Sequence, residues 1–463
     1  MGGGTLNTTD TKNNNGRIAV GIDIGTTTVS AVVYDIDNKK QLEAASVPHD
    51  SYMCSGDIFE QSTEIILDIA RTLLYRIIDT YTGIIGIGVT GQMHGIVYID
   101  DNGKAVSNLI NWQDKRADKL LSSGKTACQT IFDITKEKIS TGYGLATHYY
   151  NMLVGKAPEN ATSLCSIMDL FCMELCEINK PVTHSSVGAS FGLFDVEKGE
   201  FMLDKLALLG ICKDFLPTVT GDSIVIGECR GIPVCVPIGD NQASFLGSVS
   251  NNNESLLVNI GTGSQVSSVS EYKNVSGDIE MRPFIEGKYL ICGSALCGGY
   301  AYSMLESFFR AYATSIGQDS ASQYEIMNKL AMEEYRNGKK SVDVDVSFLG
   351  KRSDPNHKGS INNIGKDNFT PSALILGVLN GMCSELYGLY NEFGESKTHI
   401  VASGGAVRKN DVLKSLLSDR FGMAVSLNGA KEEAALGVAL FSALATKKIT
   451  YVNGFSEHIS YKQ

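Results

Sequence analysis

Long apolar runs and an excess of basic residues are both missing from this sequence of 463 residues. No apolar run approaches the roughly 20 residues that a membrane-spanning helix needs. The net charge is −11, which disfavours nucleic acid and anionic membrane surfaces as partners. The N-terminal stretch has neither the basic nor the apolar region of a signal peptide. These absences predict a cytoplasmic protein with no nucleic-acid or membrane partner.

Metal-ligand clusters and the P-loop are missing as well. The 11 cysteines are scattered, no CxxC pair occurs, and no group of Cys and His has the spacing of a zinc site. Reduced thiols in a cytosolic protein are the simplest interpretation. The pattern GxxxxGK[ST] does not occur, which excludes a P-loop nucleotide-binding protein.

One nucleotide-binding pattern does occur, because Gly86, Gly88 and Gly91 match GxGxxG. A dinucleotide-binding fingerprint should open a helix. The residues that follow this match instead continue as a strand up to a turn at Asp101. We therefore interpret the match as accidental.

The length of the chain predicts two domains, because 463 residues exceed what one hydrophobic core usually supports. Residues 1–16 are rich in Gly, Thr and Asn, which predicts a disordered tail. A polar turn between Gly247 and Ser255 marks the expected boundary. The predicted domains are therefore residues 17–249 and residues 250–463.

A strand–turn–strand pattern occurs twice, once near the start of each predicted domain. Residues 18–37 form two β-branched runs joined by a turn of Gly and Thr, which predicts a β-hairpin. The same pattern begins again at Leu256, and both copies run apolar, Asp or Asn, Ile, Gly, Thr. Asp23 of the first copy corresponds to Asn259 of the second. A repeat at this separation marks a duplicated domain rather than a solenoid.

Strands alternate with amphipathic helices after each copy of the pattern. In the first domain, apolar spacing predicts a helix over 60–79 and a strand from residue 84. In the second domain it predicts a helix over 371–393, a strand over 399–405 and helices over 411–422 and 431–448. This alternation predicts two α/β domains.

The two turns have the composition of phosphate-binding loops. Glycine lets the backbone approach a ligand closely, and successive N–H groups with Thr hydroxyls donate hydrogen bonds to phosphate oxygens. Asp23, in the strand before the first turn, is a candidate Mg²⁺ ligand, directly or through water, because hard cations prefer oxygen. One such turn alone would more often be an ordinary hairpin. Two copies, each opening a domain, favour phosphate binding.

Three polar clusters each follow an apolar strand, namely Gln92 with His94; Trp112 with Gln113, Asp114 and Arg116; and Asp240 with Asn241 and Gln242. These amides, carboxylates, guanidinium and aromatic ring suit a polyhydroxylated ligand, because each hydroxyl both donates and accepts. Taken singly, His94 could be a core histidine, Arg116 half of an ion pair and Asp240 a helix cap. Ligands collect at strand ends in α/β folds, so the shared placement favours one site.

At these residues the chain resembles the FGGY carbohydrate kinases, which are related to actin and hexokinase. The resemblance runs from about Ile18 to Ala445, with the motifs in the family's order. It implies two duplicated ribonuclease-H-like α/β domains of the actin/hexokinase type with an inter-domain cleft. It also implies that the first domain holds the sugar, that the second holds most of ATP, and that Mg²⁺ is required.

The resemblance implies roles for individual residues. Asp240 corresponds to the general base and Asp23 to the Mg²⁺-linked aspartate. The residues implied for the sugar pocket are Gln92, Met93, His94, Trp112, Asp114, Asn241 and Gln242. The residues implied for ATP are Gly25, Thr26, Thr27 and Thr28 in the first turn, Gly261, Thr262 and Gly263 in the second, and Gly404, Gly405, Ala406 and Asn410 in the adenosine motif.

The resemblance implies transfer of a phosphoryl group from ATP to the terminal primary hydroxyl of a ketose. The segments NWQDKRAD and SGGAVRKNDVLK resemble the sedoheptulokinase group more than xylulokinases. Sedoheptulose is therefore the expected sugar, with xylulose or another pentulose as the alternative. A non-catalytic sugar or nucleotide sensor is the alternative of another class, and the intact acidic and Gly/Thr residues favour the kinase. We expect a monomer or a homodimer.

Overall fold

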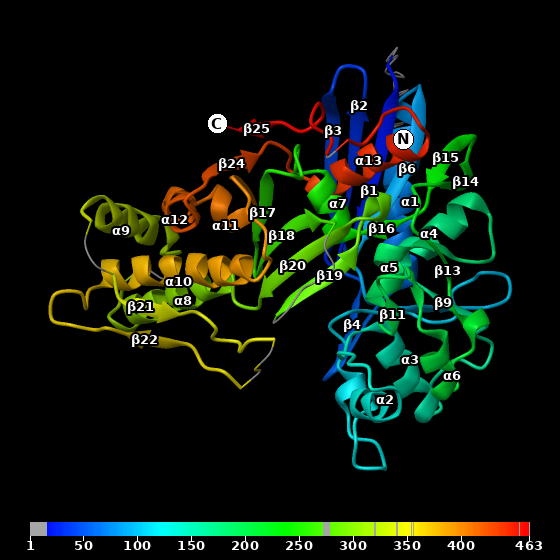
Figure 1. The fold of residues 1–463 in the computed structure, drawn as a ribbon, viewed down its shortest axis with the longest axis horizontal. Coiled ribbons are helices and arrows are strands. Elements are labelled where there is room, and N and C mark those ends of the chain that lie inside the picture. Colours follow the sequence, from blue (N-terminus) through cyan, green and yellow to red (C-terminus); the bar gives the residue numbers. More distant parts are fainter. Residues whose placement is uncertain are drawn as a thin grey trace, which may run out of the picture. The chain divides into compact units, whose positions relative to one another are not determined.

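The structure is a computed structural model, and it describes residues 16–271, 278–318, 321–338, 341–352, 354, 356–452 and 454–462. These residues form two compact units (Figure 1). Unit 1 contains the chain up to Gly247, Arg282–Lys288 and Ala430–His458. Unit 2 contains Ser248–Met281, Tyr289–Gly429 and Ile459–Gln463. The tail predicted for residues 1–16 lies outside the described residues, apart from Gly16.

Unit 1 is built on a seven-stranded mixed sheet. Its strands are β1 (Ile18–Ile24), β2 (Thr28–Asp35), β3 (Lys40–Pro48), β6 (Ile84–Gly91), β14 (Val225–Cys229), β15 (Ile232–Cys235) and β16 (Ile238–Gly239). Their order is β14-β15-β6-β1-β2-β3, and β16 also pairs with β6. β1 and β2 form the antiparallel hairpin that the sequence predicts, and β1 is parallel to β6.

The sheet of unit 2 also has seven strands. They are β17 (Ser255–Ile260), β18 (Ser264–Ser270), β19 (Ile279–Pro283), β20 (Tyr289–Ala295), β23 (His399–Ser403), β24 (Ala424–Asn428) and β25 (Tyr461–Lys462). Their order is β19-β20-β18-β17-β23-β24-β25. β17 is antiparallel to β18 and parallel to β23.

The two sheets share one topology. Five strands correspond in order, namely β3-β2-β1-β6-β15 in unit 1 and β20-β18-β17-β23-β24 in unit 2. In each unit the first strand of the hairpin pairs antiparallel with the second strand and parallel with a later strand. The predicted duplication of an α/β domain is therefore confirmed.

Helices and short strand pairs surround both sheets. In unit 1 the helices are α1 (Thr63–Thr80), α2 (Ala127–Thr135), α3 (Gly144–Leu153), α4 (Ile167–Cys176), α5 (Ser185–Ser190), α6 (Leu203–Leu208), α7 (Asp240–Leu246) and α13 (Glu433–Ala445). In unit 2 they are α8 (Gly299–Ser315), α9 (Tyr324–Arg336), α10 (Pro371–Asn391), α11 (Gly405–Arg408) and α12 (Asp411–Phe421). The smaller strands are β4 (Tyr52–Ser55), β5 (Ile58–Gln61) and β8 (Leu109–Ile110), then β7 (Val97–Ile99) with β9 (Ser163–Cys165), β10 (Val182–His184) with β13 (Thr218–Thr220), β11 (Phe194–Asp195) with β12 (Glu200–Phe201), and β21 (Asp343–Asp345) with β22 (Ser360–Asn362).

The helices expected from apolar spacing are present, and local capping explains where they begin and end. Ser62 caps α1, because its hydroxyl accepts a hydrogen bond from the backbone N–H of Ile65 at 3.3 Å. Thr370 caps α10 just ahead of Pro371, and proline suits the first helical position. Gly422 ends α12 with φ 66°, a left-handed conformation that favours glycine.

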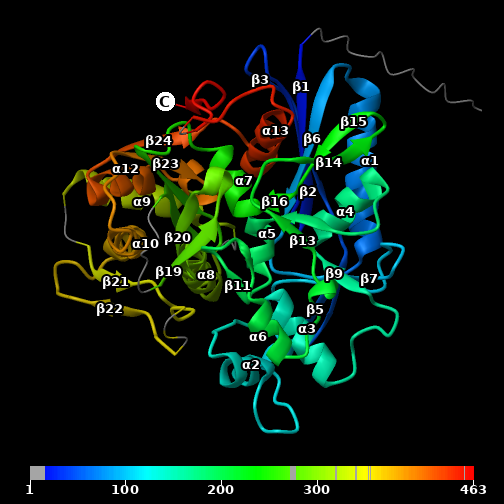
Figure 2. The ribbon, with the colours of Figure 1, turned by 45° about the vertical axis from the view of Figure 1, so that its right-hand side comes forward.

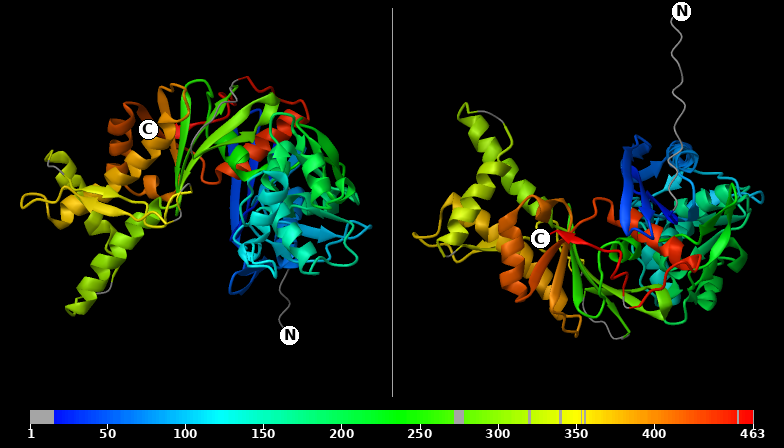
Figure 3. Two further views of the ribbon diagram at one scale, coloured as in Figure 1. Left: turned by 60° about the horizontal axis from the view of Figure 1, so that its bottom comes forward. Right: turned by 90° about the horizontal axis from the view of Figure 1, so that it is seen from above.

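Helix α13 belongs to unit 1 although it lies near the end of the chain (Figures 2 and 3). It packs on β1 and β6 at very short range. A Cβ on Gly21 would come within 1.9 Å of the carbonyl oxygen of Ala435, and one on Gly88 within 2.1 Å of that of Val438. The GxGxxG match therefore lies inside a strand, as expected, and its central glycine makes room for a helix backbone.

The sequence predicts a single domain boundary after residue 249. In the structure, unit 1 also contains α13, which lies far beyond that boundary in the chain. That helix is buried over nearly its whole length, so it needs cover on all sides. Val20 and Ile22 of β1 pack in one core with residues of α1, whereas Gly21 faces α13. Since side chains alternate along a strand, α1 and α13 cover opposite faces of the unit 1 sheet.

One helix of the described residues, α10, is long and apolar enough to cross a membrane by length and composition. The expectation that no apolar run approaches that length was wrong for this segment. A core helix passes the same test, and the apolar side chains of α10, including Leu376, Leu379 and Leu386, are buried in the core of unit 2. Helix α10 is therefore the central core helix of unit 2.

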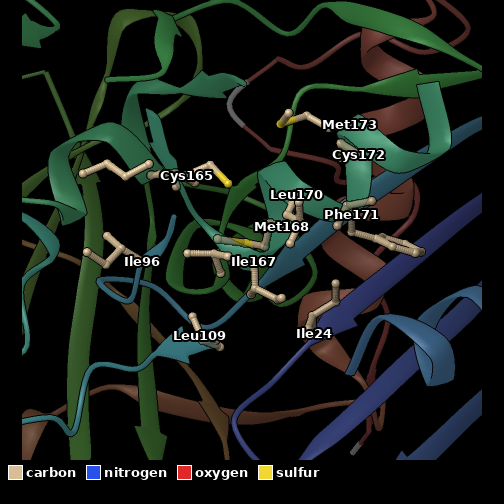
Figure 4. Close-up of a cluster of buried hydrophobic side chains, with 14 of the residues drawn as sticks. Ile24, Ile96, Leu109, Cys165, Ile167, Met168, Leu170, Phe171, Cys172 and Met173 are labelled. Carbon is tan, nitrogen blue, oxygen red and sulfur yellow. The ribbon is translucent and has the colours of Figure 1, made fainter. Parts of the chain in front are cut away.

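A buried apolar cluster of unit 1 supports the strand ends from which the candidate site begins (Figure 4). Ile167, Leu170 and Phe171 of α4 are at most 1% exposed. They belong to the same core as Ile24, the last residue of β1, and Ile96, which follows β6. Dense packing of this kind fixes the backbone where both strands end.

Candidate active site

Asp23 lies near the end of β1, on the face that α13 covers. Side chains alternate along a strand, so Asp23 shares this face with Gly21. Burial raises the pKa of Asp23 to about 7, and the nearby carboxylates of Asp240 and Glu432 add to the shift. Glu432 immediately precedes α13. Three acidic side chains therefore lie close together where β1 ends and where α7 and α13 begin.

Asp240 is the first residue of α7, and Gly239 occupies the N-cap position. The helix-cap alternative for Asp240 is therefore not what the structure shows. Its Oδ1 accepts hydrogen bonds from the backbone N and from Nδ2 of Asn241, at 2.7 and 2.9 Å. Burial raises the pKa of Asp240 to about 6, while Arg282 and the hydrogen bonds from Asn241 act in the opposite direction. A carboxylate with a pKa near neutral suits a general base.

Met93, Asn241 and Gln242 gather around the glycine that precedes Asp240. Nδ2 of Asn241 lies 3.7 Å from Sδ of Met93. A Cβ on Gly239 would come within 2.6 Å of both Sδ of Met93 and Oε1 of Gln242. Gln242 is fully buried, and its Nε2 donates to the carbonyl of Pro283 at 2.9 Å. The structure thus brings three of the predicted sugar-pocket residues together.

The first turn is held by side chains in addition to backbone, since the N–H of His49 also donates to the carbonyl of Thr27 at 3.0 Å. Nε2 of His49 lies 3.2 Å from the carbonyl oxygen of Gly25, and Nε2 of Gln61 donates to that of Thr26 at 2.9 Å. Gln92 donates in turn to Oε1 of Gln61 at 3.0 Å. Oε1 of Gln92 is a buried acceptor without a hydrogen-bond partner among the described residues. Gln92, predicted to contact the sugar, therefore supports the first turn through Gln61.

Trp112 connects the predicted sugar pocket to the first turn. Its Nε1 donates to Oγ1 of Thr26 at 3.2 Å, and its side chain is 46% exposed. Thr27 is exposed as well, and Thr28 begins β2. The ring and the turn hydroxyls therefore lie on one accessible stretch of unit 1, where an aromatic face can pack against a ligand.

Asp114 is fully buried, and four hydrogen bonds occupy its carboxylate. Oδ1 accepts from N and Nε of Arg116 at 2.9 and 2.8 Å. Oδ2 accepts from the backbone N of Phe59 at 2.8 Å and from Nη2 of Arg116 at 3.0 Å. The pair therefore holds the segment that carries Trp112. Direct contact between Asp114 and the sugar stays a prediction, and these bonds disfavour it.

His94 has a φ of 71°, which is uncommon for a residue other than glycine. Its backbone N donates to Oγ of Ser190 at 3.1 Å, and its Nδ1 lies 2.9 Å from the carbonyl oxygen of Ser190. The imidazole packs on the ring of Tyr143, with 4.4 Å between the centroids. His94 is only half-buried, so it differs from the core histidine that is the alternative for this position.

The second turn is held by backbone rather than by side chains. The N–H of Gly299 donates to the carbonyl of Gly261 at 2.8 Å, and the N–H of Tyr300 donates to that of Thr262 at 2.9 Å. Both donors lie in the first turn of α8, whose leading N–H groups have no partner within the helix. The start of α8 therefore holds this turn in place.

The predicted adenosine motif follows β23 and packs against the second turn. Gly404 has a φ of 92°, and a Cβ there would come within 2.4 Å of the carbonyl oxygen of Ile260. Asn259, at the position equivalent to Asp23, donates through Nδ2 to Oγ of Ser403 at 2.9 Å. The amide of unit 2 thus makes a local hydrogen bond where unit 1 has a carboxylate.

A cavity of about 470 Å³ in unit 2 lies between the second turn and the adenosine motif. Five predicted ATP residues line it, namely Gly261, Thr262, Gly405, Ala406 and Asn410. Its other walls include Tyr302, Tyr324, Leu379, Met382 and Leu413. A largely apolar cavity with a few polar groups suits a planar base with an attached sugar.

Tyr302, Tyr324 and Asn328 are among the residues of this cavity that the sequence did not predict. Oδ1 of Asn328 accepts from the hydroxyl of Tyr302 at 2.8 Å and from Nδ2 of Asn410 at 3.0 Å. The two tyrosine rings lie 5.8 Å apart between centroids. Asn328 and Tyr324 are four positions apart on α9, and nothing in that helix but its ordinary amphipathic spacing marks them.

Among the residues that the structure describes, no group of three or more His, Cys, Asp or Glu has the geometry to hold a metal ion alone. Mg²⁺ at phosphoryl-transfer sites usually takes one or two carboxylates, with phosphate oxygens and waters as further ligands. Asp23 fits such a site, because a cation would offset the repulsion from Asp240 and Glu432 that raises its pKa. Sequence analysis missed Glu432, although the acidic start of the last helix is a signal for it.

Two sheets of one topology, each with a Gly/Thr turn, define the two-domain ribonuclease-H-like fold of sugar kinases. The chain belongs to the FGGY family of carbohydrate kinases, because residues 18–247 match the family's N-terminal domain and residues 256–446 its C-terminal domain. The predicted family and the predicted enzyme class, a carbohydrate kinase, are therefore confirmed.

The relatives of this chain are named as kinases of different sugars. Sedoheptulokinase of Homo sapiens is 22% identical, over 91% of this chain and 96% of the relative. Xylulose kinase of Staphylococcus xylosus is 23% identical, over 96% and 94% of the two chains. Gluconokinase of Bacillus subtilis is 22% identical, over 95% and 90%. Identities this close to one another do not select one sugar.

Solved structures of the family confirm the predicted fold class. Gluconate kinase from Lactobacillus acidophilus superposes with a TM-score of 0.82 at 18% identity, over 97% of this chain and 93% of that one. Xylulose kinase from Rhodospirillum rubrum gives 0.82 at 19%, over 96% and 93%. Glycerol kinase from Plasmodium falciparum with ADP gives 0.77 at 18%, over 94% and 91%.

Proposed function

We propose that this carbohydrate kinase transfers a phosphoryl group from ATP to the terminal primary hydroxyl of a ketose, and that the ketose is sedoheptulose. The observation that carries the chemistry is Asp240, a half-buried carboxylate at the start of α7 whose pKa is raised to about 6. For the sugar, support comes from the human and mouse relatives named sedoheptulokinase, at 22% and 23% identity over 91% of this chain.

In this proposal Asp240 is the general base. It accepts the proton of the sugar's terminal hydroxyl while that oxygen attacks the terminal phosphorus of ATP. A carboxylate with a raised pKa takes a proton more readily than an ordinary one and is still ionised above pH 6. The two hydrogen bonds from Asn241 orient Oδ1, which leaves Oδ2 as the oxygen that accepts the proton.

The sugar ligands are the polar groups around Asp240. Met93 and His94 lie on the turn after β6, Asn241 and Gln242 lie in the first turn of α7, and the exposed ring of Trp112 offers a packing surface. The buried Oε1 of Gln92 is an acceptor that a hydroxyl could satisfy. A site that hydrogen-bonds each hydroxyl discriminates strongly against sugars that lack one. In this way the site would distinguish sugars with different numbers of carbon atoms.

ATP occupies the cavity of unit 2 in this proposal. The ADP-bound relative from Plasmodium falciparum supports a nucleotide substrate for the fold. The adenine ring of ATP packs among Tyr302, Leu379 and Met382, and the phosphates of ATP follow the backbone of the second turn. The hydroxyl-rich first turn, Gly25–Thr28, is the proposed partner for the terminal phosphate.

Mg²⁺ would be held by Asp23, directly or through water. When bound, the cation neutralises charge that develops on the transferred phosphoryl group. Asp23 fits this duty better than Asn259 of the other turn, because a carboxylate has the charge that a hard cation prefers. The chain's own contribution is to keep Asp23 close to Asp240 on a rigid strand.

A coupled ADP-release assay tests the proposal with sedoheptulose, xylulose, ribulose, gluconate and glycerol. We expect the highest kcat/KM for sedoheptulose. A preference for xylulose would overturn the choice of sugar and leave the carbohydrate kinase standing, and the 23% identical xylulose kinase of Staphylococcus xylosus makes xylulose the second candidate. Sugar binding without ADP release on any of the five would support the non-catalytic sensor. A cytoplasmic location and a monomeric or homodimeric state stay predictions.

A further inference from the structure

The short helix α5, Ser185–Ser190, holds both turns that carry the proposed sugar ligands and base. Ser186 and Ser190 are four positions apart, so they lie on one face of the helix. Oγ of Ser190 accepts from the backbone N of His94 at 3.1 Å, and Oγ of Ser186 accepts from the backbone N of Gly239 at 3.1 Å. Both serines are at most 3% exposed.

Ser190 determines the conformation and the tautomer of His94. A φ of 71° is strained for a residue other than glycine, and the bond from the N–H of His94 to Ser190 helps to hold it there. Nδ1 of His94 lies 2.9 Å from the carbonyl oxygen of Ser190. A carbonyl can only accept, so Nδ1 carries the proton and Nε2 is the acceptor nitrogen.

Ser186 is held in a fixed orientation by His184, the residue before α5. Nε2 of His184 lies 3.3 Å from the carbonyl oxygen of Gly221, so Nε2 carries the proton. Nδ1 then accepts, taking the backbone N–H of Ser186 at 3.1 Å and its hydroxyl at 2.9 Å. Because its hydroxyl proton is committed to His184, Oγ of Ser186 can only accept from Gly239.

The hydrogen bond to Gly239 matters because the next residue is Asp240. The backbone has little room at this point, since a Cβ on Gly239 would lie 2.6 Å from Sδ of Met93. A small shift of Gly239 would therefore move Asp240, the residue bonded to it. Misplacement of a catalytic group by about 1 Å can cost about a hundredfold in rate.

We propose that Ser186 and Ser190 are positioning residues that keep the base-bearing turn and the sugar-binding turn in register from one face of α5. The proposal rests on the proposed function, which assigns the base to Asp240 and a sugar contact to His94. Ser186 acts on the rate through Gly239, and Ser190 acts on sugar binding through His94. Neither serine has to touch a substrate.

Steady-state kinetics of single variants test the two roles separately. We expect Ser190→Ala to raise the KM for the sugar about tenfold with kcat within about twofold, because the sugar contact loosens. We expect Ser186→Ala to lower kcat about tenfold with the sugar KM within about twofold, because the base shifts. Ser186→Thr and Ser190→Thr keep the hydroxyl and should recover most of each loss.

Ser185→Ala is the matched control, since Ser185 is 3% exposed on the same helix and its hydroxyl makes no hydrogen bond to either turn in the described part of the chain. It should leave kcat and KM unchanged. Thermal unfolding of every variant separates positioning from folding. If both alanine variants lower Tm but match the control in kcat and KM, the serines are only structural and the proposal is wrong.

Histidine tautomers provide a readout that needs no substrate. Long-range ¹H–¹⁵N spectra, assigned with His94→Gln and His184→Gln, should show His94 protonated at Nδ1 and His184 at Nε2. Ser190→Ala keeps the carbonyl that fixes the tautomer and removes only the hydroxyl, so it should leave Nδ1 protonated but shift the ring ¹⁵N resonances of His94, whereas the Ser185 control should leave them in place. An Nε2-protonated His94 in the unmodified protein overturns the proposal. This result stands even if none of the tested sugars is phosphorylated, so the two proposals can fail separately.

Discussion

The two Gly/Thr turns have nearly the same sequence but are held in place by different means. In unit 1, His49 and Gln61 bind the turn carbonyls from the side. In unit 2, the backbone N–H groups of Gly299 and Tyr300 bind them. The last residue but one is Asp23 in the first strand and Asn259 in the second. Duplication has thus conserved the shape of the turn while its support and its charge have diverged.

The largest expected effect comes from removing the base, which belongs to unit 1 alone. Asp240→Asn keeps the shape of the side chain but cannot accept the hydroxyl proton. We expect kcat to fall by about 10²- to 10⁴-fold, while the dissociation constant for the sugar stays within a few-fold. Single-turnover kinetics and calorimetric titration of the sugar measure the two quantities.

The pH dependence of the unmodified enzyme is the companion measurement for Asp240. Its pKa is raised to about 6, so the base is protonated and idle below that pH. We expect kcat/KM to fall as the pH drops through about 6 and to be flat from there to neutral pH. Near-normal turnover of Asp240→Asn would show that another group is the base.

The same substitution in both turns tests the difference in support. A Cβ on Gly299 would come within 2.6 Å of the carbonyl oxygen of Gly261, whereas one on Gly25 would meet nothing closer than 3.1 Å. Overpacking of this kind costs about 1–3 kcal/mol. Gly299→Ala should therefore raise the KM for ATP by roughly 5- to 150-fold. Gly25→Ala should change it by less than about fivefold.

Gly388→Ala is the control for these glycine substitutions, because a Cβ there meets nothing within 4 Å on helix α10. Alanine favours a helix over glycine, so this variant should keep its KM and unfold at the same or a slightly higher temperature. Equal effects of Gly25→Ala and Gly299→Ala would contradict the difference in support between the turns.

Gln61→Leu removes the side-chain support that only the first turn has. Nε2 of Gln61 donates to the carbonyl of Thr26, and its Oε1 accepts from Gln92 and from Asn111. Loss of one partner leaves the others unsatisfied in a buried place, at a cost of about 1–3 kcal/mol. Urea unfolding should show this loss. The exposed Gln318 of unit 2 offers a control, and Gln318→Leu should change the stability by less than about 0.5 kcal/mol.

Asp23→Asn gives the first strand–turn–strand copy the asparagine that the second copy has. Its effect on the free energy of unfolding is the smallest of the effects predicted here. The pKa of Asp23 rises to about 7 in the folded chain from 3.8, so the folded state holds the proton more tightly. Stability is therefore lost as the pH rises from about 4 to about 7. Asparagine cannot ionise, so the variant should be more stable than the unmodified protein at pH 8, by roughly 1–2 kcal/mol after solvent screening. At pH 4 the difference should nearly vanish.

Chemical unfolding at the two pH values measures this effect, and Asp37→Asn on the surface should show no comparable gain at pH 8. A gain that is the same at both pH values would mean that Asp23 ionises normally. Turnover of Asp23→Asn should be lost in the same samples, which would separate the catalytic duty of this aspartate from its cost to folding.

Local patterns were sufficient to predict the duplicated hairpin, the helices after it and the residues of both turns. The strand at residues 18–24 and its copy at 255–260 are recognised by β-branched spacing and by Gly-Thr turns, which act over a few residues. Five of the predicted ATP residues do line one cavity, because they lie on turns that follow neighbouring parallel strands.

Contacts between distant segments could not be predicted in the same way. The duty of Asp114 depends on Arg116 and Phe59, and nothing in the sequence distinguishes a carboxylate that binds sugar from one that binds a buried arginine. Asn328 lines the cavity from an ordinary amphipathic helix. The return of α13 to unit 1 depends on a close fit to Gly21 and Gly88, which appears only in three dimensions.

The packing of α13 in unit 1 also affects the order in which the two units can fold during synthesis. A ribosome delivers the N-terminal strands first, but one face of their sheet stays uncovered until residues 433–445 have been synthesised. Unit 2 lies almost entirely between those two stretches of the chain, so it can complete its own core first. The sheet of unit 1 therefore leaves one face without its covering helix until α13 has been synthesised.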